Sequence, residues 1–220
     1  MLVLFGPRTQ QMVLVSIPRD TVASIPRRGR QRINSALTMG GPELTARTVE
    51  RLLGLPVDYY VLAKFGNFQR IVNQLGGIPV TLDRPLVDPE ARANLPRGST
   101  SLTGTQALAL ARARKRVPGG DVGRAANQQK IVLGAFQAHA RVAQPRWELF
   151  YRLLREETES NIGARDALAF VPALGSLSPD RVRTFIVPGR VGMLGGASVI
   201  FPSESGIRDI RREARSAVGL

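Results

Sequence analysis

The chain has no cysteine and only one histidine among its 220 residues. The lack of cysteine excludes disulfide bonds, thiolate nucleophiles and cysteine-based metal sites. A single histidine excludes a multi-histidine metal site and leaves little room for Ser-His-Asp chemistry. Lysine is scarce as well, because arginine supplies all of the 31 basic residues except Lys64, Lys115 and Lys130. Any catalysis must therefore proceed without a thiol and without a histidine cluster.

The sequence also lacks a long apolar run. No stretch reaches the about 18 apolar residues that a membrane-spanning helix requires. The opening residues, Met1–Phe5, are apolar but too few for a signal-peptide core, and they lack its charged start. We therefore expect them to form a strand, and a chain that begins directly in a strand is expected to lack a segment that precedes it.

What is abundant is positive charge, with a formal net charge of +14. Arginine presents a planar fork that binds phosphate or carboxylate through two hydrogen bonds. The charge is thus compatible with an anionic partner such as a phosphate group, nucleic acid or anionic lipid. A general preference for arginine over lysine explains the total equally well. Only the placement of individual arginines is informative.

Strand and helix patterns alternate along the chain and predict one layered α/β domain over residues 1–220. Residues 1–5 and 12–17 are two apolar runs that predict a hairpin, so the sheet should be mixed. Residues 58–65 are aromatic and β-branched and predict a strand. Residues 83–101 are rich in proline and aspartate and show no periodic pattern.

Further elements are indicated by capping signals and periodicity. Thr103 with Gln106 three residues later forms a capping-box pattern that predicts the start of a helix. The remaining predicted elements are helices over residues 41–54, 68–75, 121–142, 145–157 and 163–174, strands at 78–82, 182–187 and 198–201, and a helix from residue 203. The aromatic residues Tyr59, Tyr60, Phe65 and Phe68 are expected to be core residues first of all.

The strongest local signal for function is Arg112 with Arg114. The helix before them should end nearby, and on extended backbone two side chains at this spacing project to the same side. Such a pair is a clamp of two guanidinium groups suited to phosphate or pyrophosphate. A solvated basic loop is the alternative.

Asp121, Arg124 and Gln128 follow at helical spacing. Asp121 is suited to cap the next helix, which places Arg124 in its first turn. A cation in the first turn lies near the positive end of the helix dipole, which is unfavourable. An arginine at this position is better explained if an anion binds between it and the helix N-terminus. Gln128 lies on the same face as Arg124 and can donate a further hydrogen bond.

A second candidate site lies in the segment Ser16–Thr21, at the end of a predicted strand. Arg19 could bind phosphate there, and Asp20 could orient it or bring a metal near. A buried ion pair that fixes the loop is an equal alternative. Arg32 is a weaker candidate, because an ordinary surface arginine is the favoured interpretation.

These segments together resemble the LytR–CpsA–Psr family, in matching order and over essentially residues 1–220. The segments that carry the resemblance are Val15–Thr21, Arg32–Ala36, Gly40–Pro42, Val57–Val61, Leu75–Val80, Leu102–Leu108, Arg112–Arg114 and Asp121–Arg124 with Gln128–Gln129. The resemblance implies a three-layer α/β/α sandwich with a central mixed β-sheet and an apolar tunnel for a polyprenyl chain.

The resemblance also implies an extracytoplasmic phosphotransferase, anchored in the membrane, that moves a glycopolymer from a polyprenyl-(pyro)phosphate carrier to peptidoglycan. A divalent cation such as Mg²⁺ usually assists, and a pyrophosphatase side activity is a further expectation. On this match the residues that bind the head group are Arg19, Arg112, Arg114, Arg124 and Gln128. Asp20 supports the site and Arg32 lies at its edge.

The chain departs from the family pattern in two places. Relatives carry an upstream membrane anchor, a preceding strand and an aspartate that is thought to serve the metal. This sequence begins inside the strand that follows them, so we expect all three to be missing from it. Asn127 stands where many relatives have arginine. A polyprenyl-phosphate-binding homologue with impaired catalysis is therefore an alternative. A nucleic-acid-binding regulator is a weaker one, because the sequence shows no helix-turn-helix and no stacking-aromatic motif, and we expect no nucleic-acid partner.

Overall fold

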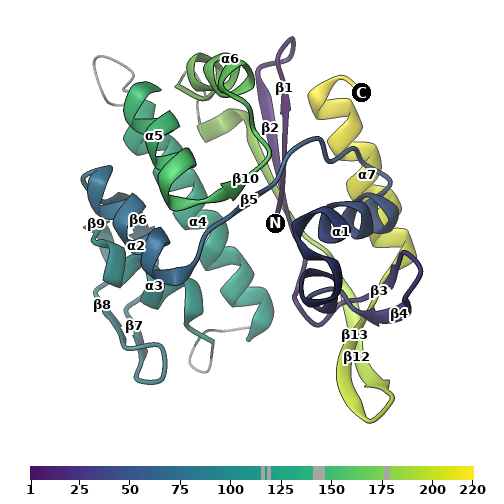
Figure 1. Cartoon of the computed structure of the whole chain (residues 1–220). Helices are drawn as coiled ribbons and strands as arrows, with labels where there is room; N and C mark the ends of the chain where they lie inside the picture. The colour runs from purple at the N-terminus through teal and green to yellow at the C-terminus, as the bar shows by residue number, and fades with distance from the viewer. Residues whose placement is uncertain (115–116, 118–119, 141–146, 176–178) are drawn as a thin grey trace. The chain divides into compact units, whose positions relative to one another are not determined.

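The computed structural model describes the chain except residues 115–116, 118–119, 141–146 and 176–178 (Figure 1). It divides the chain into two compact units. Unit 1 comprises residues Met1–Tyr60 and Asp180–Leu220, and unit 2 comprises Val61–Pro179. Each unit has its own buried apolar cluster.

Unit 1 is built on a mixed three-stranded sheet. Its elements are β1 (Leu2–Gly6), β2 (Gln11–Ser16), β3 (Val22–Ile25), β4 (Gly29–Arg32), α1 (Ser35–Leu53), β11 (Val182–Ile186), β12 (Gly189–Leu194), β13 (Ala197–Pro202) and α7 (Glu204–Val218). Strand β2 lies between β1, which is antiparallel to it, and β11, which is parallel. The predicted first hairpin and the mixed character of the sheet are both confirmed.

The position of β2 explains its sequence. Met12, Val13, Leu14 and Val15 are all fully buried, as expected for a central strand covered on both faces. Helix α7 packs against β1 and β2, and its apolar stripe, which includes Ile207, Ile210 and Ala214, joins their cluster. This packing fixes the end of β2, from which residues Ile17–Asp20 leave the sheet.

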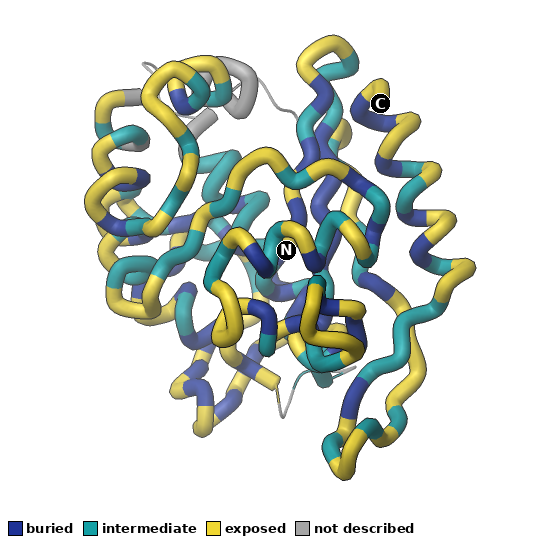
Figure 2. The backbone as a smooth tube through the Cα atoms, turned by 45° about the vertical axis from the view of Figure 1, so that its right-hand side comes forward, coloured by how far each residue is buried: buried dark blue, intermediate teal, exposed yellow. Residues whose placement is uncertain are grey.

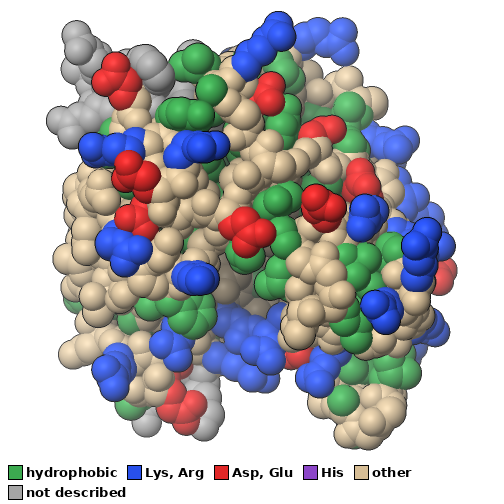
Figure 3. All heavy atoms as spheres, viewed as in Figure 1, with side chains coloured by type: hydrophobic (Ala, Val, Ile, Leu, Met, Phe, Trp, Pro, Cys, Tyr) green, Lys and Arg blue, Asp and Glu red, His purple; other side chains and the backbone are tan. Residues whose placement is uncertain are grey.

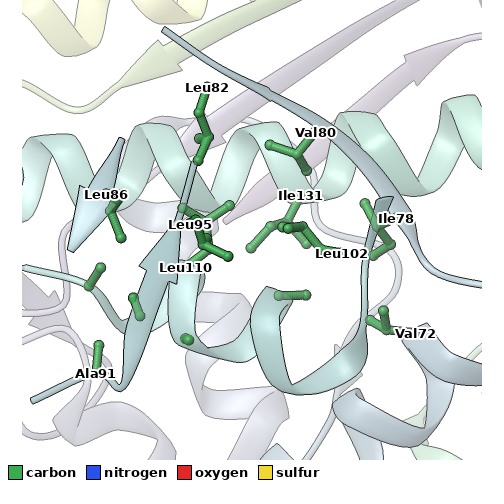
Figure 4. Close-up of a cluster of buried hydrophobic side chains, with 14 residues drawn as sticks. Val72, Ile78, Val80, Leu82, Leu86, Ala91, Leu95, Leu102, Leu110 and Ile131 are labelled. Atoms are coloured by element: carbon green, nitrogen blue, oxygen red, sulfur yellow. The ribbon is translucent and has the colours of Figure 1, made fainter. Parts of the chain in front are cut away.

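Unit 2 combines helices with short strand pairs. Its elements are β5 (Val61–Leu62), α2 (Phe65–Gln74), β6 (Ile78–Leu82), β7 (Leu86–Asp88), β8 (Ala93–Leu95), β9 (Gly98–Leu102), α3 (Gly104–Arg112), α4 (Asp121–Ala140), α5 (Trp147–Glu157), β10 (Glu159–Ser160) and α6 (Ala164–Gly175); a 3-10 helix at Pro179–Arg181 precedes β11. Figure 4 shows how its core forms, with Leu95, Leu102, Leu110 and Ile131 meeting from β8, β9, α3 and α4.

Helix α3 begins as the sequence predicts. The Thr103 hydroxyl accepts a hydrogen bond from the Gln106 backbone N–H, and the Gln106 side chain accepts one from the Thr103 N–H at 2.9 Å, which completes the capping box. Gly104 follows, and a Cβ at this position would collide with the backbone of Gln69 in α2. A glycine is therefore required for α3 to pack closely on α2 and to carry Arg112 at its far end.

Some predictions are wrong. Residues 58–65 form only the two-residue strand β5, because their pairing partner β10 is equally short. Residues 83–101 are not irregular, since they contain β7, β8 and most of β9. Tyr59 and Phe65 are not core residues, because 37% and 63% of their surface is exposed. Among the helices that the structure describes, none is both long enough and apolar enough to cross a bilayer.

The α/β class is confirmed. The prediction of a single domain over residues 1–220 stays a prediction.

Candidate functional site

Unit 2 contains a pocket of about 520 Å³ at the end of helix α3. The residues that line it are Asp88, Glu90, Ala91, Arg112, Arg114 and Gly120. They come from three places in unit 2: the loop between β7 and β8, the end of α3, and the start of α4. Two arginines thus face one cavity together with two carboxylates.

Arg112 and Arg114 reach this pocket because the backbone changes between them. Arg112 is the last residue of α3, and Ala113 has extended backbone angles (φ −57°, ψ 128°). Ala113 is fully buried, so its side chain holds the turn against the core. The two guanidinium-bearing side chains on either side of it line the same pocket, which is the arrangement that their spacing predicts.

Arg112 also contacts an aromatic ring. Its guanidinium carbon lies 5.5 Å from the ring centroid of Phe65, at the start of α2. An arginine above an aromatic face gains electrostatic attraction and loses rotational freedom. The exposed ring of Phe65 therefore restrains Arg112 without neutralising its charge.

Asp88 is a site residue that the sequence interpretation missed. It is 2% exposed, and its Oδ2 accepts a hydrogen bond of 2.9 Å from the backbone N–H of Arg114. Its Oδ1 accepts bonds from the backbone N–H groups of Glu90 and Ala91. Asp88 thus ties the β7–β8 loop to Arg114. The sequence feature that could have identified Asp88 is the Asp-Pro pair at residues 88–89, because Asp-Pro favours turn initiation.

Asp121, at the start of α4, lies between two arginines. Its Oδ1 is 3.2 Å from Arg114 Nε and 2.9 Å from Arg124 Nη2. These are ion-pair distances, yet the same buried oxygen has no partner with hydrogen-bond geometry. The sequence argument that Arg124 needs an external anion is therefore weakened, because Asp121 already supplies negative charge beside it. Asp121 is the first residue of α4 rather than its cap.

Gln128 has a role within the chain. Its Nε2 donates a hydrogen bond of 3.2 Å to the backbone oxygen of Ala111. That oxygen belongs to the last turn of α3, whose carbonyl groups lack helical partners. Gln128 therefore fixes α4 to the end of α3, one residue before Arg112.

The candidates of unit 1 form their own group. Arg19 Nε and Arg32 Nη1 each lie 3.5 Å from Asp20 Oδ1. The two arginine side chains are 58% and 40% exposed, whereas that of Asp20 is 18% exposed. The backbone N–H of Ile33 also donates to the Thr21 oxygen, which holds β4 beside this loop. Asp20 therefore gathers two accessible guanidinium groups at the end of β2.

Comparison with known proteins identifies the family. The model of the LytR_cpsA_psr family matches residues 1–216. The chain belongs to the LytR–CpsA–Psr family. The fold agrees, since the crystal structure of Bacillus subtilis TagV has a TM-score of 0.87 and 27% identity, over 99% of this chain and 87% of that one.

Two further relatives of this LytR–CpsA–Psr protein have names that describe a ligand or an activity. A structure of TagT bound to LIIa-WTA has a TM-score of 0.84 and 25% identity, covering 99% of this chain and 84% of TagT. TagU of Bacillus cereus, a polyisoprenyl-teichoic acid–peptidoglycan teichoic acid transferase, is 37% identical over 141 residues. That match covers 64% of this chain and 46% of TagU. The chain spans about half the length of the curated relatives it matches.

The family implies a divalent cation, and the donor set of unit 2 can be tested for it. Mg²⁺ in phosphoryl-transfer sites is held by one or two carboxylates together with water and substrate phosphates. Within the described residues no group of three or more His, Cys, Asp or Glu side chains is placed to hold a metal. Asp121 fits the role of a single carboxylate ligand, because its Oδ1 is buried and unsatisfied. Asp88 does not fit, since backbone N–H groups occupy both of its oxygens.

Proposed function

We propose that this chain is a phosphotransferase that moves a glycopolymer from a polyprenyl-(pyro)phosphate carrier to peptidoglycan. The observation that carries the proposal is the unit 2 pocket, where Arg112 and Arg114 face one cavity and Arg124 lies beside them through Asp121. The activity in the names of TagU and TagV supports the substrate class. No thiol or histidine cluster is required by such a reaction.

Phosphoryl transfer needs mainly positioning and stabilisation of charge. In the proposed reaction a hydroxyl group of peptidoglycan attacks the phosphorus atom nearest the glycopolymer. A new P–O bond forms, the P–O bond to the lipid phosphate breaks, and the hydroxyl proton is released. Arg112 and Arg114 bind the phosphate oxygens on which negative charge accumulates. Asp88 and Phe65 hold these two arginines in place.

A divalent cation such as Mg²⁺ is part of the proposal, with Asp121 as its ligand from this chain. When bound, the ion would neutralise charge on the phosphates. Asp121 would then lie between the ion and the guanidinium groups of Arg114 and Arg124, which it would keep in place for the substrate. Isothermal titration of the lipid-free protein with Mg²⁺, with and without inorganic pyrophosphate, tests this. Binding that Asp121→Asn leaves unchanged would contradict the assignment.

The unit 1 group is proposed to bind phosphate as well. Arg19 and Arg32 are more than a third exposed, so they can exchange Asp20 for a substrate oxygen. Asp20 would hold both guanidinium groups in reach of one anion. Titration of Arg19→Ala and Arg32→Ala with a polyprenyl pyrophosphate measures this directly. We expect weaker binding in each variant.

The decisive experiment replaces Arg112 and Arg114 by Ala and measures transfer of lipid-linked glycopolymer to peptidoglycan in the presence of Mg²⁺. Removing one preorganised charge-stabilising donor costs about 100-fold or more in rate, so we expect transfer to vanish while Tm stays nearly unchanged. The matched control replaces Arg84 and Arg97, two exposed arginines of unit 2 that do not line the pocket. A large fall in Tm, or retained transfer, would contradict the proposal.

A lipid-binding homologue with impaired catalysis is the second candidate. The observation that favours it is that Asp121, the carboxylate assigned to the metal, already pairs with Arg114 and Arg124. Mass spectrometry of the purified protein for a co-bound polyprenyl lipid, beside the transfer assay, separates the two. Bound lipid without any transfer would establish the binder. Release of phosphate from polyprenyl pyrophosphate in the same assay tests for the expected pyrophosphatase side activity.

The substrates imply an extracytoplasmic place of action, which we include in the proposal together with membrane anchoring in the full-length protein. Protease protection in intact cells and spheroplasts, with detection of an epitope fused to the chain, tests it. Cleavage in spheroplasts without permeabilisation is the expected result. We expect no tight nucleic-acid binding in a gel-shift series at physiological salt.

A further inference from the structure

One face of the β12–β13 hairpin of unit 1 carries an arginine and an aromatic ring (Figure 1). The two strands pair antiparallel, with Arg190 directly opposite Phe201. Directly opposed residues lie on the same face of a sheet, and the next residue along each strand lies on the other face. Arg190 is exposed, and Figure 2 shows the end of the hairpin in the colour of exposed residues. The guanidinium group of Arg190 is therefore accessible on the face of Phe201.

The ring of Phe201 contacts both β12 and a second arginine. A Cβ at Gly192 would lie 2.8 Å from Cε2 of the ring, so only a glycine lets the ring lie this close to β12. The guanidinium carbon of Arg30, in β4, lies 5.9 Å from the ring centroid, which is within the range of a cation–π contact. The ring therefore restrains Arg30 on the face that also carries Arg190. We call the group formed by Arg30, Arg190 and Phe201 the Phe201 surface.

The Phe201 surface adjoins the Asp20 group of unit 1. Arg30 and Arg32 are two residues apart in β4, so they lie on the same face of the strand, about 7 Å apart along it. Arg32 pairs with the Asp20 side chain, and the N–H of Ile200 in β13 donates a hydrogen bond of 2.9 Å to the backbone oxygen of Asp20. The Phe201 surface is thus next to residues that are proposed to bind the phosphate of the lipid carrier.

The two arginines of the Phe201 surface carry charge that no acid offsets. Arg30 and Arg190 are exposed, and among the residues that the structure describes no carboxylate forms an ion pair with either of them. Figure 3 shows further basic side chains around this part of unit 1. Like charges near one ring repel each other, and an anion bound between them reverses this effect.

The arrangement of the two guanidinium groups fits a phosphodiester. They come from different strands, β4 and β12, so they approach from different directions. A carboxylate presents both oxygens in one direction and suits a single arginine fork, whereas a phosphodiester has two charged non-bridging oxygens that two separate arginines can bind. A nucleic acid is matched less well, because stacking of a base needs an open aromatic face and Arg30 already lies over the ring. The partner indicated is a phosphodiester chain without bases.

We infer that the Phe201 surface is a subsite for a phosphodiester group of the glycopolymer, beyond the (pyro)phosphate that joins the polymer to its lipid. Arg30 and Arg190 bind the charged oxygens, and Phe201 is a positioning residue that acts through Arg30. The subsite binds the polymer and takes no part in the transfer step. The inference rests on the proposed function, because it concerns the polymer that is transferred.

The first test measures binding of a lipid-free oligomer of glycerol phosphate to the purified chain, so that neither lipid nor transfer is involved. Arg30→Gln/Arg190→Gln should weaken binding about tenfold, because two exposed charge contacts are lost. Added salt should weaken binding by the unaltered chain. The control Arg8→Gln/Arg47→Gln removes the same charge from the β1–β2 turn and from α1, where both arginines are exposed. It should bind like the unaltered chain.

The second test compares lipid-linked substrates with and without a phosphodiester chain. For the substrate with the chain, the double variant should raise KM about tenfold and leave kcat unchanged, since only binding is affected. For the substrate without the chain, neither constant should change. Phe201→Leu should raise KM about twofold to fivefold, again only when the chain is present, because Arg30 loses its restraint.

A fluorescent label covers the case in which these variants fail to fold. Ser24 is exposed and lies directly opposite Arg30 in the β3–β4 ladder. Because the chain has no cysteine, Ser24→Cys provides a single thiol beside the subsite for an environment-sensitive fluorophore. We expect the glycerol phosphate oligomer to shift its emission, and to leave unchanged the same label at the exposed Ser216, near the end of α7.

The outcomes separate the subsite from the proposed function. No shift at residue 24, equal weakening in the control variant, or equal binding of a single-stranded DNA of the same charge would each overturn the subsite. If the unaltered chain binds the oligomer at the Phe201 surface but transfers no polymer, the proposed function is wrong and the phosphodiester subsite stands.

Discussion

Each unit contains an aspartate that lies between two arginines, but the two groups differ in their distances and in the exposure of their side chains. In unit 1, Asp20 lies 3.5 Å from both Arg19 and Arg32, whose side chains are well exposed. In unit 2, Asp121 lies 2.9 Å from Arg124, which is only 17% exposed, and 3.2 Å from Arg114. The unit 2 group adjoins the pocket at the end of α3 through Arg114.

The difference shows how burial changes an ion pair. Exposed pairs at longer distances are screened by water and contribute little, whereas shorter and less exposed pairs fix geometry more firmly. The loose triad of unit 1 leaves its arginines free to move toward an anion. In unit 2 the short Asp121–Arg124 pair is little exposed and holds Arg124 in place before any anion arrives, whereas the Arg114 side chain is 57% exposed. Preorganised charge is the property that accelerates a reaction.

The first test of this comparison removes the negative charge of the central aspartate in each unit, Asp121 in unit 2 and Asp20 in unit 1. Asp121→Asn should lower the transfer rate about tenfold or more, because the short ion pair with the little-exposed Arg124 is screened less by water than an exposed pair. Asp20→Asn should lower it at most about fivefold, since exposed pairs contribute about 0–1 kcal/mol. Single-turnover transfer assays with both variants measure the ratio. Equal losses would show that the two triads do not differ in function.

The next prediction concerns the residue that holds Arg114. Asp88→Asn places an amide group against the Arg114 N–H and leaves one buried donor without a partner, which costs about 1–3 kcal/mol of unfolding free energy. We expect a several-fold fall in transfer as well, because the Arg114 backbone loses its restraint. Denaturant unfolding and the transfer assay measure both effects. Asp83→Asn is the control, since the Asp83 side chain is 84% exposed and pairs with Lys130 at the surface. A similar loss there would contradict the role of Asp88.

The contrast between local and non-local signals explains what the sequence could predict. The capping box of α3 and the first hairpin depend on neighbours in sequence, and both were predicted. Strands β7 and β8 have three residues each and are stabilised by pairing with one another, so they leave no periodic pattern. The glycine-rich strand β12 was missed for the same reason. Residues 58–65 show the opposite error, because β propensity without a long partner strand gives only β5.

The same contrast between local and long-range contacts applies to the candidate site. Arg112 and Arg114 could be predicted because their arrangement depends on local backbone geometry. The ion pair of Asp121 with Arg124 was available from their spacing of three residues on a helix, although it was not used. The contacts of Asp88 with Arg114 and of Gln128 with Ala111 bridge 26 and 17 residues. No spacing rule indicates such contacts, so they required the structure.

The ion pairs Arg70–Glu157 in unit 2 and Arg183–Glu213 in unit 1 differ in exposure, so they should contribute differently to stability. In unit 2, Arg70 forms a bidentate pair with Glu157, with 2.9 Å from Nε to Oε1 and 2.8 Å from Nη2 to Oε2. This hydrogen-bonded contact holds the pKa of Glu157 below its ordinary value. Because the folded-state pKa is lowered, the stabilisation is complete above the unfolded value of 4.5 and is lost as pH falls through the folded pKa.

Glu157→Gln should therefore lower Tm at neutral pH, and the difference from the original chain should shrink as the pH falls below about 4.5. The control in unit 1 is Glu213→Gln, because the pair of Glu213 with Arg183 is nearly half exposed on both sides. That variant should change Tm little at any pH. Thermal unfolding followed by circular dichroism over this pH range makes the measurement. A constant difference for Glu157→Gln would show that packing, rather than the charge, is lost.

The smallest expected effect concerns the ring that restrains Arg112. Phe65→Leu removes the cation–π contact but keeps an apolar side chain, and such a contact contributes about 0.5–1 kcal/mol at an exposed site. Substrate affinity or rate should fall about twofold to fivefold, as this energy implies, and Phe65→Tyr should restore it because the ring face remains. Since Phe65 is 63% exposed, Tm should not change.

If Phe65→Leu in the Arg112→Ala background lowers transfer by the same factor again, Phe65 acts independently of Arg112. If it has no further effect there, the ring works through the guanidinium group, and the preorganisation that separates unit 2 from unit 1 extends to an uncharged neighbour.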